Sequence, residues 1–316
     1  MLLTFHSPTN PLVAALRAAG REVVCVEDFR DAHERLQGCS AYYGNLFTEL
    51  RFPAAFLRLR AALRRRGIPY VFWNRDAPWN VGMTRPRQWL LRMLKPVDLY
   101  LTHSMQRAEW FSRNEAVYFP NAARPEYCSH TDLPALRDPA SYHHDVCFVG
   151  TLGNAKRRAC RERLAFLGAL QDRMKARAET LRLCIVDTVA RQAGVDEQLA
   201  LIRGSKINLN YGAMCDLPDN PSWGLPERAF GIPAAGGFLL TDWRRTIPET
   251  FAEGSCDFFR DAEDCANKIA HYFRRFDELR TRAESLHRQV LDQHTYGVRA
   301  SRLLELLGPQ SRPPAV

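Results

Sequence analysis

The sequence predicts an α/β protein made of two Rossmann-like domains. Strand-like apolar segments alternate with helix-like segments through the first part of the chain. A proline-containing interval with little periodicity follows at 119–145, where we expect the domain linker, and the same alternation then begins again. Strands that are separated by helices favour parallel, doubly wound sheets. The 316 residues, 46% of them hydrophobic, are enough to bury the cores of two domains of ordinary size.

The first half of the chain holds the elements of one such domain. We expect helices at 11–17, 54–66 and 86–94, and strands at 2–5, 22–26, 68–73 and 97–101. One side of the second helix carries apolar residues at helical spacing, which predicts that this side is buried: Phe52, Phe56, Leu59 and Leu63. Gly67 follows at a place typical of a helix end.

The second half repeats this order. We expect strands at 145–150, 181–186, 206–210 and 238–241, and helices at 156–175, 195–202, 262–276 and 282–307, the last interrupted near His294. We place an N-terminal Rossmann-like domain at 1–135 and a C-terminal one at 136–308. The final helix can cross back to the first domain, and 309–316 is expected to be a flexible tail.

Composition excludes several classes of protein. No apolar run approaches the roughly 18 residues that a membrane-spanning helix needs, and residues 1–6 lack the basic start of a signal peptide. The nine cysteines, an odd number without a CxxC pair, indicate reduced thiols and argue against a disulfide framework or a zinc site. We therefore expect a cytoplasmic protein that binds no metal.

The net charge of +9 is concentrated in one segment. Between Arg51 and Lys95 there are eleven lysines and arginines against one acid, Asp76. One interpretation is a solvated helix face. Another is attraction to an anionic membrane or a lipid-linked acceptor, which would place the protein peripherally at the inner membrane face. Nucleic-acid binding is not expected, because no recognition motif accompanies the charge.

Ligands of open α/β sheets bind beyond the carboxyl ends of the strands, so with two such domains the expected site is the cleft between them. In the segment 146–158, a strand runs through Gly150 and Thr151 into a helix that begins near Lys156 and Arg157. Glycine lets a ligand approach the backbone, and the N–H groups of a helix start favour anions. A diphosphate fits this segment, but an ordinary strand–turn–helix with solvated basic residues has the same pattern.

A second segment, 205–212, contains Lys206, Asn208 and Asn210. The two asparagines are two apart on a strand and therefore point to the same side. Asparagine is unfavourable in strands, and a buried asparagine needs hydrogen-bond partners. We expect these side chains to contact a ligand or to support a neighbouring loop.

The third segment, 223–242, is the most specific. A charged pair precedes a short helix of small residues, and two glycines turn this helix into an apolar strand. The residues of interest are Glu227, Arg228, Gly231, Gly236, Gly237, Thr241 and Asp242. The small residues allow the backbone to approach a ligand closely.

This third segment resembles the donor-binding domain of the group 1 glycosyltransferases, in the variety that is similar to the spore-maturation protein CgeB. The family pattern is roughly Arg-x-Phe-Glu-x-x-Ala-x-Gly-x-Phe-Leu-Leu-Thr-Asp, and it stands here at 228–242. The resemblance is strong from 145 to 300, and looser before that, at 73–79 and 118–122. It implies the GT-B fold, in which two Rossmann-like domains face each other across a cleft.

The sequence departs from the family pattern at one position. The family's glutamate, which usually binds the ribose of the nucleotide, falls on Gly231 here. Glu227 lies one helical turn earlier on the same face and can take its place. Alternatively, the ribose is recognised differently, or catalysis is lost.

The resemblance also implies a metal-independent enzyme without a cofactor, whose co-substrate is a nucleotide-diphosphate sugar. The donor would bind the C-terminal domain and the acceptor the N-terminal one. Without a metal, the protein itself must neutralise the leaving diphosphate. We expect this of Lys156, Arg157, Lys206 and Arg228, with N–H groups at Gly150–Thr151 and Gly236–Gly237.

The acceptor hydroxyl needs a base unless the donor phosphate serves. Asp76, His6 and His103 stand at strand ends of the first domain, and each also has a structural interpretation as a cap or core residue. The sequence thus predicts a hexosyltransferase-like glycosyltransferase acting on a glycan, lipid or protein. The alternatives are a catalytically degenerate GT-B protein that binds a nucleotide sugar or glycan without turnover, and a sugar-nucleotide epimerase.

Overall fold

The structure is a computed structural model that describes residues 1–76, 85–114, 116–154, 156–177, 181–213, 216 and 223–308, without the side chains of Arg85 and Arg87. These residues form two compact units. Unit 1 comprises Met1–Pro120 and the helix that begins at Tyr296, and unit 2 comprises Asn121–Thr295. The tail expected at 309–316 and the end of the segment 73–79 lie outside the described residues.

Unit 1 is built on a six-stranded sheet in the order β2-β1-β3-β4-β5-β6. Its strands are β1 (Leu2–Thr4), β2 (Val23–Cys25), β3 (Ala41–Tyr43), β4 (Tyr70–Asn74), β5 (Leu99–Thr102) and β6 (Val117–Tyr118). Every pairing is parallel. The carboxyl ends of all these strands therefore lie along one edge of the sheet.

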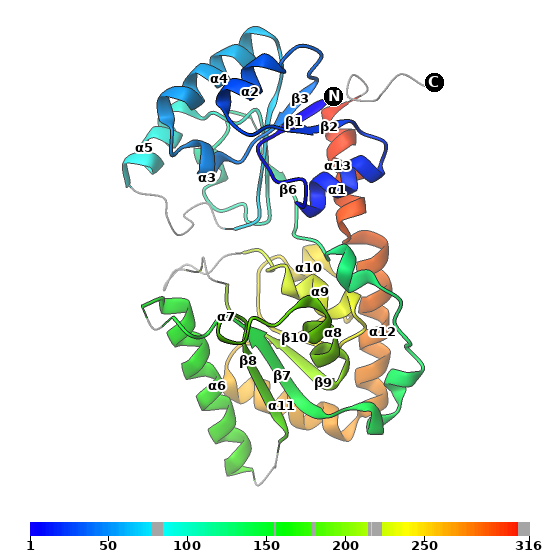
Figure 1. Cartoon of the computed structure of the whole chain (residues 1–316). Coiled ribbons are helices and arrows are strands. Elements are labelled where there is room, and N and C mark those ends of the chain that lie inside the picture. The colour runs from blue at the N-terminus through cyan, green and yellow to red at the C-terminus, as the bar shows by residue number, and fades with distance from the viewer. Residues whose placement is uncertain are drawn as a thin grey trace. The chain divides into compact units, whose positions relative to one another are not determined.

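Helices cover both faces of the unit 1 sheet (Figure 1). One face carries α2 (Phe29–Glu34), α4 (Pro53–Arg65) and α5 (Arg85–Leu94). On the other face, α1 (Pro11–Ala18) packs against α13 (Tyr296–Leu307). The short helix α3 (Leu46–Glu49) follows β3. This layering confirms the doubly wound arrangement that the alternation of strands and helices predicts.

Helix α4 illustrates how the sequence sets an element. Pro53 occupies the first helical position, where no backbone N–H is needed. Phe56, Leu59 and Leu63 are completely buried, as their helical spacing predicts, but Phe52 is 60% exposed because it precedes the first helical residue. Gly67 ends the segment with a φ of 66°, a value in the left-handed region that suits glycine.

Unit 2 is built on a five-stranded parallel sheet in the order β11-β10-β9-β7-β8. Its strands are β7 (His144–Gly150), β8 (Leu183–Asp187), β9 (Ser205–Asn210), β10 (Leu239–Asp242) and β11 (Asp257–Phe259). The helices are α6 (Arg158–Ala176), α7 (Thr188–Arg191), α8 (Val195–Arg203), α9 (Arg228–Ala234), α10 (Ile247–Thr250), α11 (Ala262–Arg274) and α12 (Phe276–Gln293).

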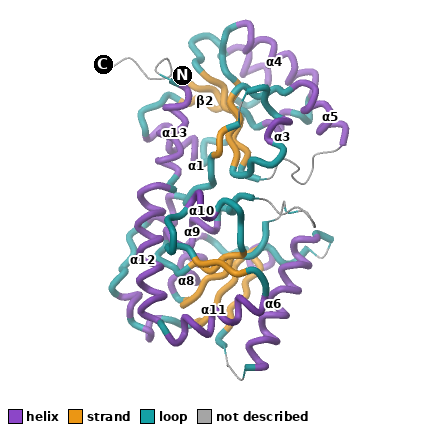
Figure 2. The backbone as a smooth tube through the Cα atoms, turned by 180° about the vertical axis from the view of Figure 1, so that it is seen from behind, coloured by secondary structure: helices purple, strands orange, loops and turns teal. Residues whose placement is uncertain are grey.

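Two cores lie on the two faces of this sheet. Phe166 of α6 and Ile269 of α11 belong to one, and Ile202 of α8 and Phe230 of α9 belong to the other. The long helix α12 packs against α9 (Figure 2). Each face of the sheet is thus covered, as parallel sheets require.

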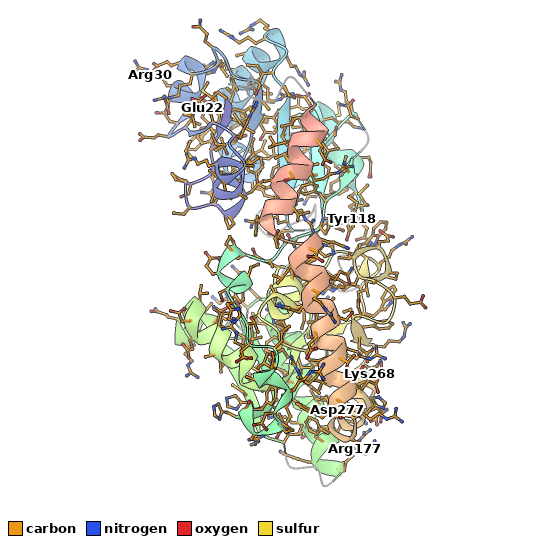
Figure 3. All side chains as sticks on the ribbon, turned by 90° about the vertical axis from the view of Figure 1, so that its right-hand side faces the viewer. Glu22, Arg30, Tyr118, Arg177, Lys268 and Asp277 are labelled. Carbon is orange, nitrogen blue, oxygen red and sulfur yellow. The ribbon has the colours of Figure 1, made fainter. Side chains whose placement is uncertain are left out.

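Side-chain pairs tie α11 to its neighbours. Lys268 Nζ lies 2.6 Å from Asp257 Oδ1 on β11, and Arg177 at the end of α6 pairs with Glu263 at the start of α11. Lys268 and Arg177 are labelled in Figure 3. These contacts hold α11 against β11 and α6.

The sequence pattern did not predict β3, and the predicted domain boundary differs from the one in the structure. The strand β3 has only three residues, too few to show an alternating pattern, although all are buried. The interval 119–145 was expected to be a linker, but from Asn121 onward it packs on unit 2. Asn121 Nδ2 donates to Leu225 O at 2.9 Å, and Ala123 N donates to His294 O at 2.8 Å. Unit 2 therefore begins after Pro120, not at residue 136.

The final helix α13 belongs to unit 1, as the crossing-back of the last helix would require. Arg75 Nη1 donates to Tyr296 Oη at 2.7 Å, and Arg299 Nε donates to Pro120 O at 2.8 Å. No helix within the described residues is both long and apolar enough to span a membrane.

Candidate functional site

The carboxyl edge of the unit 2 sheet gathers polar residues and glycines. β7 ends at Gly150, β9 at Asn210 and β10 at Asp242. These three strands are neighbours in a parallel sheet, so their ends lie side by side. Ligands of open α/β sheets bind beyond this edge, which makes it the first place to look for a site.

Arg228 is the first residue of α9 and reaches back to the end of β7. Its guanidinium lies 5.0 Å from the centre of the Phe148 ring. A Cβ atom built on Gly150 would lie 3.0 Å from Arg228 Nη1, so the arginine fills the space that any other residue at 150 would need. Glycine at 150 therefore leaves room for the close approach of this guanidinium.

The Nη1 atom of Arg228 is buried and has no hydrogen-bond partner among the described residues. Burial lowers the pKa of Arg228, and the positive charge of Arg163 lowers it further. A buried donor without an acceptor costs free energy, and an anion would remove that cost. Arg228 is therefore suited to hold an anionic group at the carboxyl edge.

A second arginine, Arg163 of α6, ties together two loops at this edge. Its guanidinium donates to the carbonyl oxygens of Thr151 at 3.1 Å, Tyr211 at 3.2 Å and Gly212 at 3.1 Å. Arg163 was not among the residues that the sequence pattern predicted for the site. The available signal was an arginine on the apolar side of α6, at helical spacing from Cys160 and Leu167.

A charged network holds the loops that follow β9 and β10. Arg244 Nη2 lies 2.7 Å from Asp216 Oδ2 and 3.0 Å from Asp242 Oδ2. Burial alone would lower the pKa of Arg244, but the two carboxylates raise it above its usual value. Asp242 also accepts from Gly212 N at 3.1 Å. Asp242 therefore positions the loop through these bonds.

Asn210 and Thr241 take part in the same arrangement. Asn210 Nδ2 donates to Thr241 Oγ1 at 2.8 Å and to Asp242 Oδ1 at 3.2 Å. Asn210 Oδ1 is buried and has no hydrogen-bond partner within the described ranges. Asn210 thus supports neighbouring loops, which is one of the two roles expected for it.

Asp187, at the end of β8, holds the loop after β7. It was not among the residues predicted for the site. Its Oδ1 accepts from Leu152 N at 3.2 Å and from Val189 N at 3.1 Å. A Cβ atom on Gly153 would lie only 2.5 Å from Asp187 Oδ2. An acid directly after an apolar strand was the signal in the sequence. Thr151 contacts the same region through Thr188, with 3.4 Å between their hydroxyl oxygens.

Position 231, where the family pattern has a glutamate, is a glycine that faces the ring of Tyr127. A Cβ atom on Gly231 would contact the ring of Tyr127 at 3.5 Å. Tyr127 Oη donates to Gln198 Oε1 at 2.6 Å, which holds the ring in place. Glu227 pairs with Arg124 at 3.1 Å and is partly exposed. Tyr127 thus lies where a longer side chain at 231 would project.

The expected cations divide into two groups. Lys156 and Arg157 are exposed in the loop that leads from β7 to α6, beyond the same carboxyl edge as Arg228. Lys206 is the second residue of β9 and lies near the amino end of that strand. Its Nζ pairs with Asp145 Oδ1 at 2.9 Å. The structure therefore places Lys206 at the opposite edge of the sheet, and we leave it out of the site.

Gly236, Gly237 and Asn208 also lie away from the carboxyl edge. The two glycines precede β10, at its amino end. A Cβ atom on Gly237 would lie 2.6 Å from Ile202 Cγ2 and 2.9 Å from Asn208 Nδ2. Asn208 Nδ2 donates to Ile202 O at 3.1 Å. These residues were expected to contact the donor, but Gly237 and Asn208 contact α8 here, and Gly236 faces Thr131 and Leu136.

The three candidate bases follow strands of unit 1. His6 comes after β1, Asp76 after β4 and His103 after β5. His6 Nε2 lies 3.2 Å from Gly44 O, and burial lowers its pKa to about 4. His103 is buried, and its backbone N–H donates to Asn74 O at 3.4 Å. Asp76 N donates to Asn74 Oδ1 at 3.1 Å. All three therefore lie along the carboxyl edge of unit 1.

The part of the chain that the structure describes holds no group of three or more His, Cys, Asp or Glu side chains arranged to bind a metal ion. The carboxyl edge of unit 2 carries several positive groups among the described residues: Lys156, Arg157, Arg163, Arg228 and Arg244. An anion held there would meet protein cations.

The architecture can be compared with solved structures. A glycosyltransferase from Rickettsia africae superposes with a TM-score of 0.60 at 12% identity, over 98% of this chain and 89% of that one. The chain has the GT-B fold. A sucrose-phosphate synthase from Thermosynechococcus elongatus gives a TM-score of 0.60 at 14% identity, over 96% and 97% of the two chains. HepE from Anabaena, solved in complex with UDP and glucose, gives a TM-score of 0.57 at 11% identity, over 97% of this chain and 98% of that one.

Sequence comparison adds a domain assignment. Residues 157–305, just under half of the chain, match the family model described as glycosyl transferase-like. No curated protein matches the sequence. The expected GT-B fold is thus confirmed, and the second half of the chain contains a glycosyltransferase-like domain.

Proposed function

We propose that this GT-B protein is a glycosyltransferase whose unit 2 binds the diphosphate of a nucleotide sugar at the carboxyl edge of its sheet. The observation that carries the proposal is the buried Nη1 of Arg228, which has no partner among the described residues and lies beside Gly150. The match of residues 157–305 to a glycosyl transferase-like family supports the reaction class.

The proposed chemistry follows from where charge develops. The acceptor oxygen forms a bond to the anomeric carbon of the donor sugar. The bond from that carbon to the phosphate breaks, and the nucleoside diphosphate leaves with additional negative charge. Arg228 is held by its packing before any ligand arrives, so it can stabilise this charge without reorganising. Lys156 and Arg157 add positive charge, and the proposal needs neither a metal nor a cofactor.

We propose a uridine nucleotide as the first donor to test. Support comes from the Anabaena HepE structures, which were solved with UDP and with UDP-glucose. The donor would then be a hexose nucleotide, in keeping with the CgeB-like pattern at 228–242.

The acceptor, a glycan, a lipid or a protein, is proposed to bind unit 1. There the candidate bases His6, Asp76 and His103 line the carboxyl edge. His6 is neutral at neutral pH because its pKa is lowered to about 4, which also makes it a weak base. Asp76 is therefore the base that we favour. Asp76→Asn should abolish transfer while leaving nucleotide binding to unit 2 unchanged.

A second function, donor binding without turnover, has one observation in its favour. Tyr127 lies against Gly231, where the family glutamate would contact the ribose. If Glu227 does not replace that glutamate, the ribose loses a contact that such enzymes use. Glu227→Ala tests this point, and it should weaken nucleotide binding if Glu227 has taken over the role.

The deciding experiment is a ligand screen followed by a turnover assay. The melting temperature of the full chain is measured with UDP-, GDP-, dTDP-, ADP- and CMP-sugars, because a bound ligand raises it. The ligand that raises it is then incubated with glycan, lipid and protein acceptors. Release of nucleoside diphosphate in step with glycosylated product supports the transferase. Binding without release supports the degenerate alternative, and no rise with any sugar nucleotide contradicts both.

We also propose that the protein works in the cytoplasm. The eight cysteines that the structure describes are all free thiols, and several are buried. A reducing compartment keeps thiols in this state. Localisation of a tagged full-length chain by cell fractionation tests this proposal.

A further inference from the structure

We propose that the outer side of α4 and α5 in unit 1 docks on an anionic lipid surface. We call this side the α4–α5 surface and define it by Leu57, Arg58, Arg65, Trp89, Arg92 and Met93. The proposal concerns a partner of unit 1 and is independent of donor binding in unit 2.

The first observation is uncompensated positive charge. Arg58 and Arg65 are exposed on α4 and Arg92 is exposed on α5, and neither helix contains an acidic residue. None of the three arginines forms an ion pair with another described residue, and Arg92 instead lies 3.7 Å over the ring of Trp110. On the neighbouring helix α2, by contrast, Arg30 pairs with Glu34. The charge of the α4–α5 surface is therefore available to an external anion.

The second observation is exposed apolar side chains between these arginines. Trp89 is 64% exposed, Met93 62% and Leu57 42%. Trp89 and Met93 are four residues apart, so they stand on the same side of α5, with Arg92 beside them. Large apolar residues at such exposure are unfavourable in water. Arginine interleaved with tryptophan and leucine is typical of helices that lie in a membrane interface.

The two helices present these residues in the same direction. Both α4 and α5 connect adjacent parallel strands, from β3 to β4 and from β4 to β5. Right-handed crossovers place such helices on the same face of a sheet, and Figure 1 shows α4 and α5 there together. Phe56 of α4 and Leu91 of α5 face the same core. Their outer sides therefore lie on the same side of unit 1.

A lipid bilayer matches this combination better than other anions. Anionic headgroups attract arginine, with a gain of about 1 kcal/mol for each basic residue near the membrane. The interface below them accepts tryptophan, leucine and methionine. An RNA would satisfy the arginines but would leave Leu57 and Met93 in water.

The test is co-sedimentation of the full chain with vesicles, without any nucleotide. Vesicles of phosphatidylcholine alone are compared with vesicles that also contain phosphatidylglycerol. We expect the wild type to bind only the anionic vesicles, and less at high salt. The double variant Arg58→Glu/Arg65→Glu should bind at least about tenfold more weakly. The control Arg274→Glu/Arg288→Glu changes the net charge equally in unit 2 and should bind like the wild type.

A second pair of variants separates the apolar contribution. Trp89→Ala/Met93→Ala should lower vesicle binding at least about fivefold. Leu164→Ala/Val189→Ala removes two exposed apolar side chains of unit 2, which are 49% and 64% exposed, and should have no effect. All substituted positions are exposed, and circular dichroism checks that each variant is folded. The proposal is overturned if the wild type does not bind anionic vesicles, if the unit 1 variants bind like the wild type, or if single-stranded RNA binds the surface and vesicles do not.

Discussion

Arg228 and Gly150 form a matched pair at the carboxyl edge of the unit 2 sheet. The arginine approaches so closely that a side chain at 150 would contact Nη1 at 3.0 Å. From the sequence, each was recognised separately, as a cation and as a glycine at a strand end. Their contact was not foreseen, because it joins the first residue of α9 to the end of β7. The contacts of Arg163 were not foreseen either, because its carbonyl partners lie in two loops that follow different strands.

The matched pair gives a first prediction. Gly150→Ala should displace the Arg228 guanidinium, because the added methyl group would also lie 3.0 Å from the Phe148 ring. We expect nucleotide binding to weaken, with a loss of stability of about 1–3 kcal/mol from overpacking. Isothermal titration with UDP and thermal unfolding measure the two effects. Unchanged binding would show that Arg228 can move without consequence for the ligand.

Glu49, which is buried, and His6, which is half-buried, give a prediction about pH. Burial raises the pKa of Glu49 from 4.5 to about 7, although Tyr70, Asn45 N–H and Tyr42 donate to it. Folded Glu49 therefore keeps a proton that the unfolded chain releases, and its contribution to stability falls as pH rises through this window. The pKa of His6 is lowered from 6.5 to about 4, so its contribution is lost as pH falls through that window.

Because these two effects oppose each other, single variants should reveal them. His6→Asn leaves the Glu49 effect, and the free energy of unfolding should fall by up to about 3 kcal/mol as pH rises across the Glu49 window. Glu49→Gln leaves the His6 effect, and stability should rise with pH across the His6 window. Thermal unfolding over this pH range measures both. Equal slopes in the two variants would contradict the assignment.

At the scale of elements, the α9–β10 corner shows what sequence patterns can and cannot give. The pattern of small residues and two glycines correctly predicted a tight helix-to-strand connection. Because the two glycines precede the strand, they lie at its amino end and not at the carboxyl edge where the donor is proposed to bind. Gly237 faces Ile202 and Asn208, so its small size serves packing against α8. Short elements such as β3 escaped prediction because three residues carry no period.

The corner gives an element-scale prediction. Gly237→Ala should destabilise unit 2 by about 1–3 kcal/mol, because its methyl group would approach Ile202 Cγ2 to 2.6 Å. Nucleotide affinity of the folded variant should stay unchanged, since the residue is remote from the carboxyl edge. A lower melting temperature with the same affinity for UDP is the expected result. A selective loss of affinity would return Gly237 to the site.

At the scale of the whole molecule, the alternation of strands and helices was sufficient to predict two doubly wound domains. The boundary was misplaced because prolines in 119–145 indicate turns but not the unit on which those turns pack. The resemblance at 228–242 supplied the GT-B fold, which the solved structures confirm. Tertiary contacts such as that of Asn121 with Leu225 decide the boundary, and no local pattern encodes them.

The division into units predicts that unit 2 folds alone. A chain of residues 121–295 keeps its sheet, both of its cores and Arg228. We expect it to unfold cooperatively and to bind UDP with an affinity close to that of the full chain. A shorter chain that begins at 136 lacks Tyr127 and the strand bridge of Ala123 with Thr295, and should be less stable. If the shorter chain is equally stable, the boundary after Pro120 is wrong.

The most direct test of the central claim is calorimetric titration of UDP into three forms of the full chain: wild type, Arg228→Met and Lys206→Met. Both variants remove one positive charge, the first at the carboxyl edge and the second at the opposite edge of the same sheet. We predict that Arg228→Met weakens UDP binding at least about tenfold, the loss expected for a charged hydrogen bond. Lys206→Met should bind like the wild type. If Arg228→Met binds UDP as the wild type does, or if Lys206→Met loses as much affinity, the proposed diphosphate site is wrong.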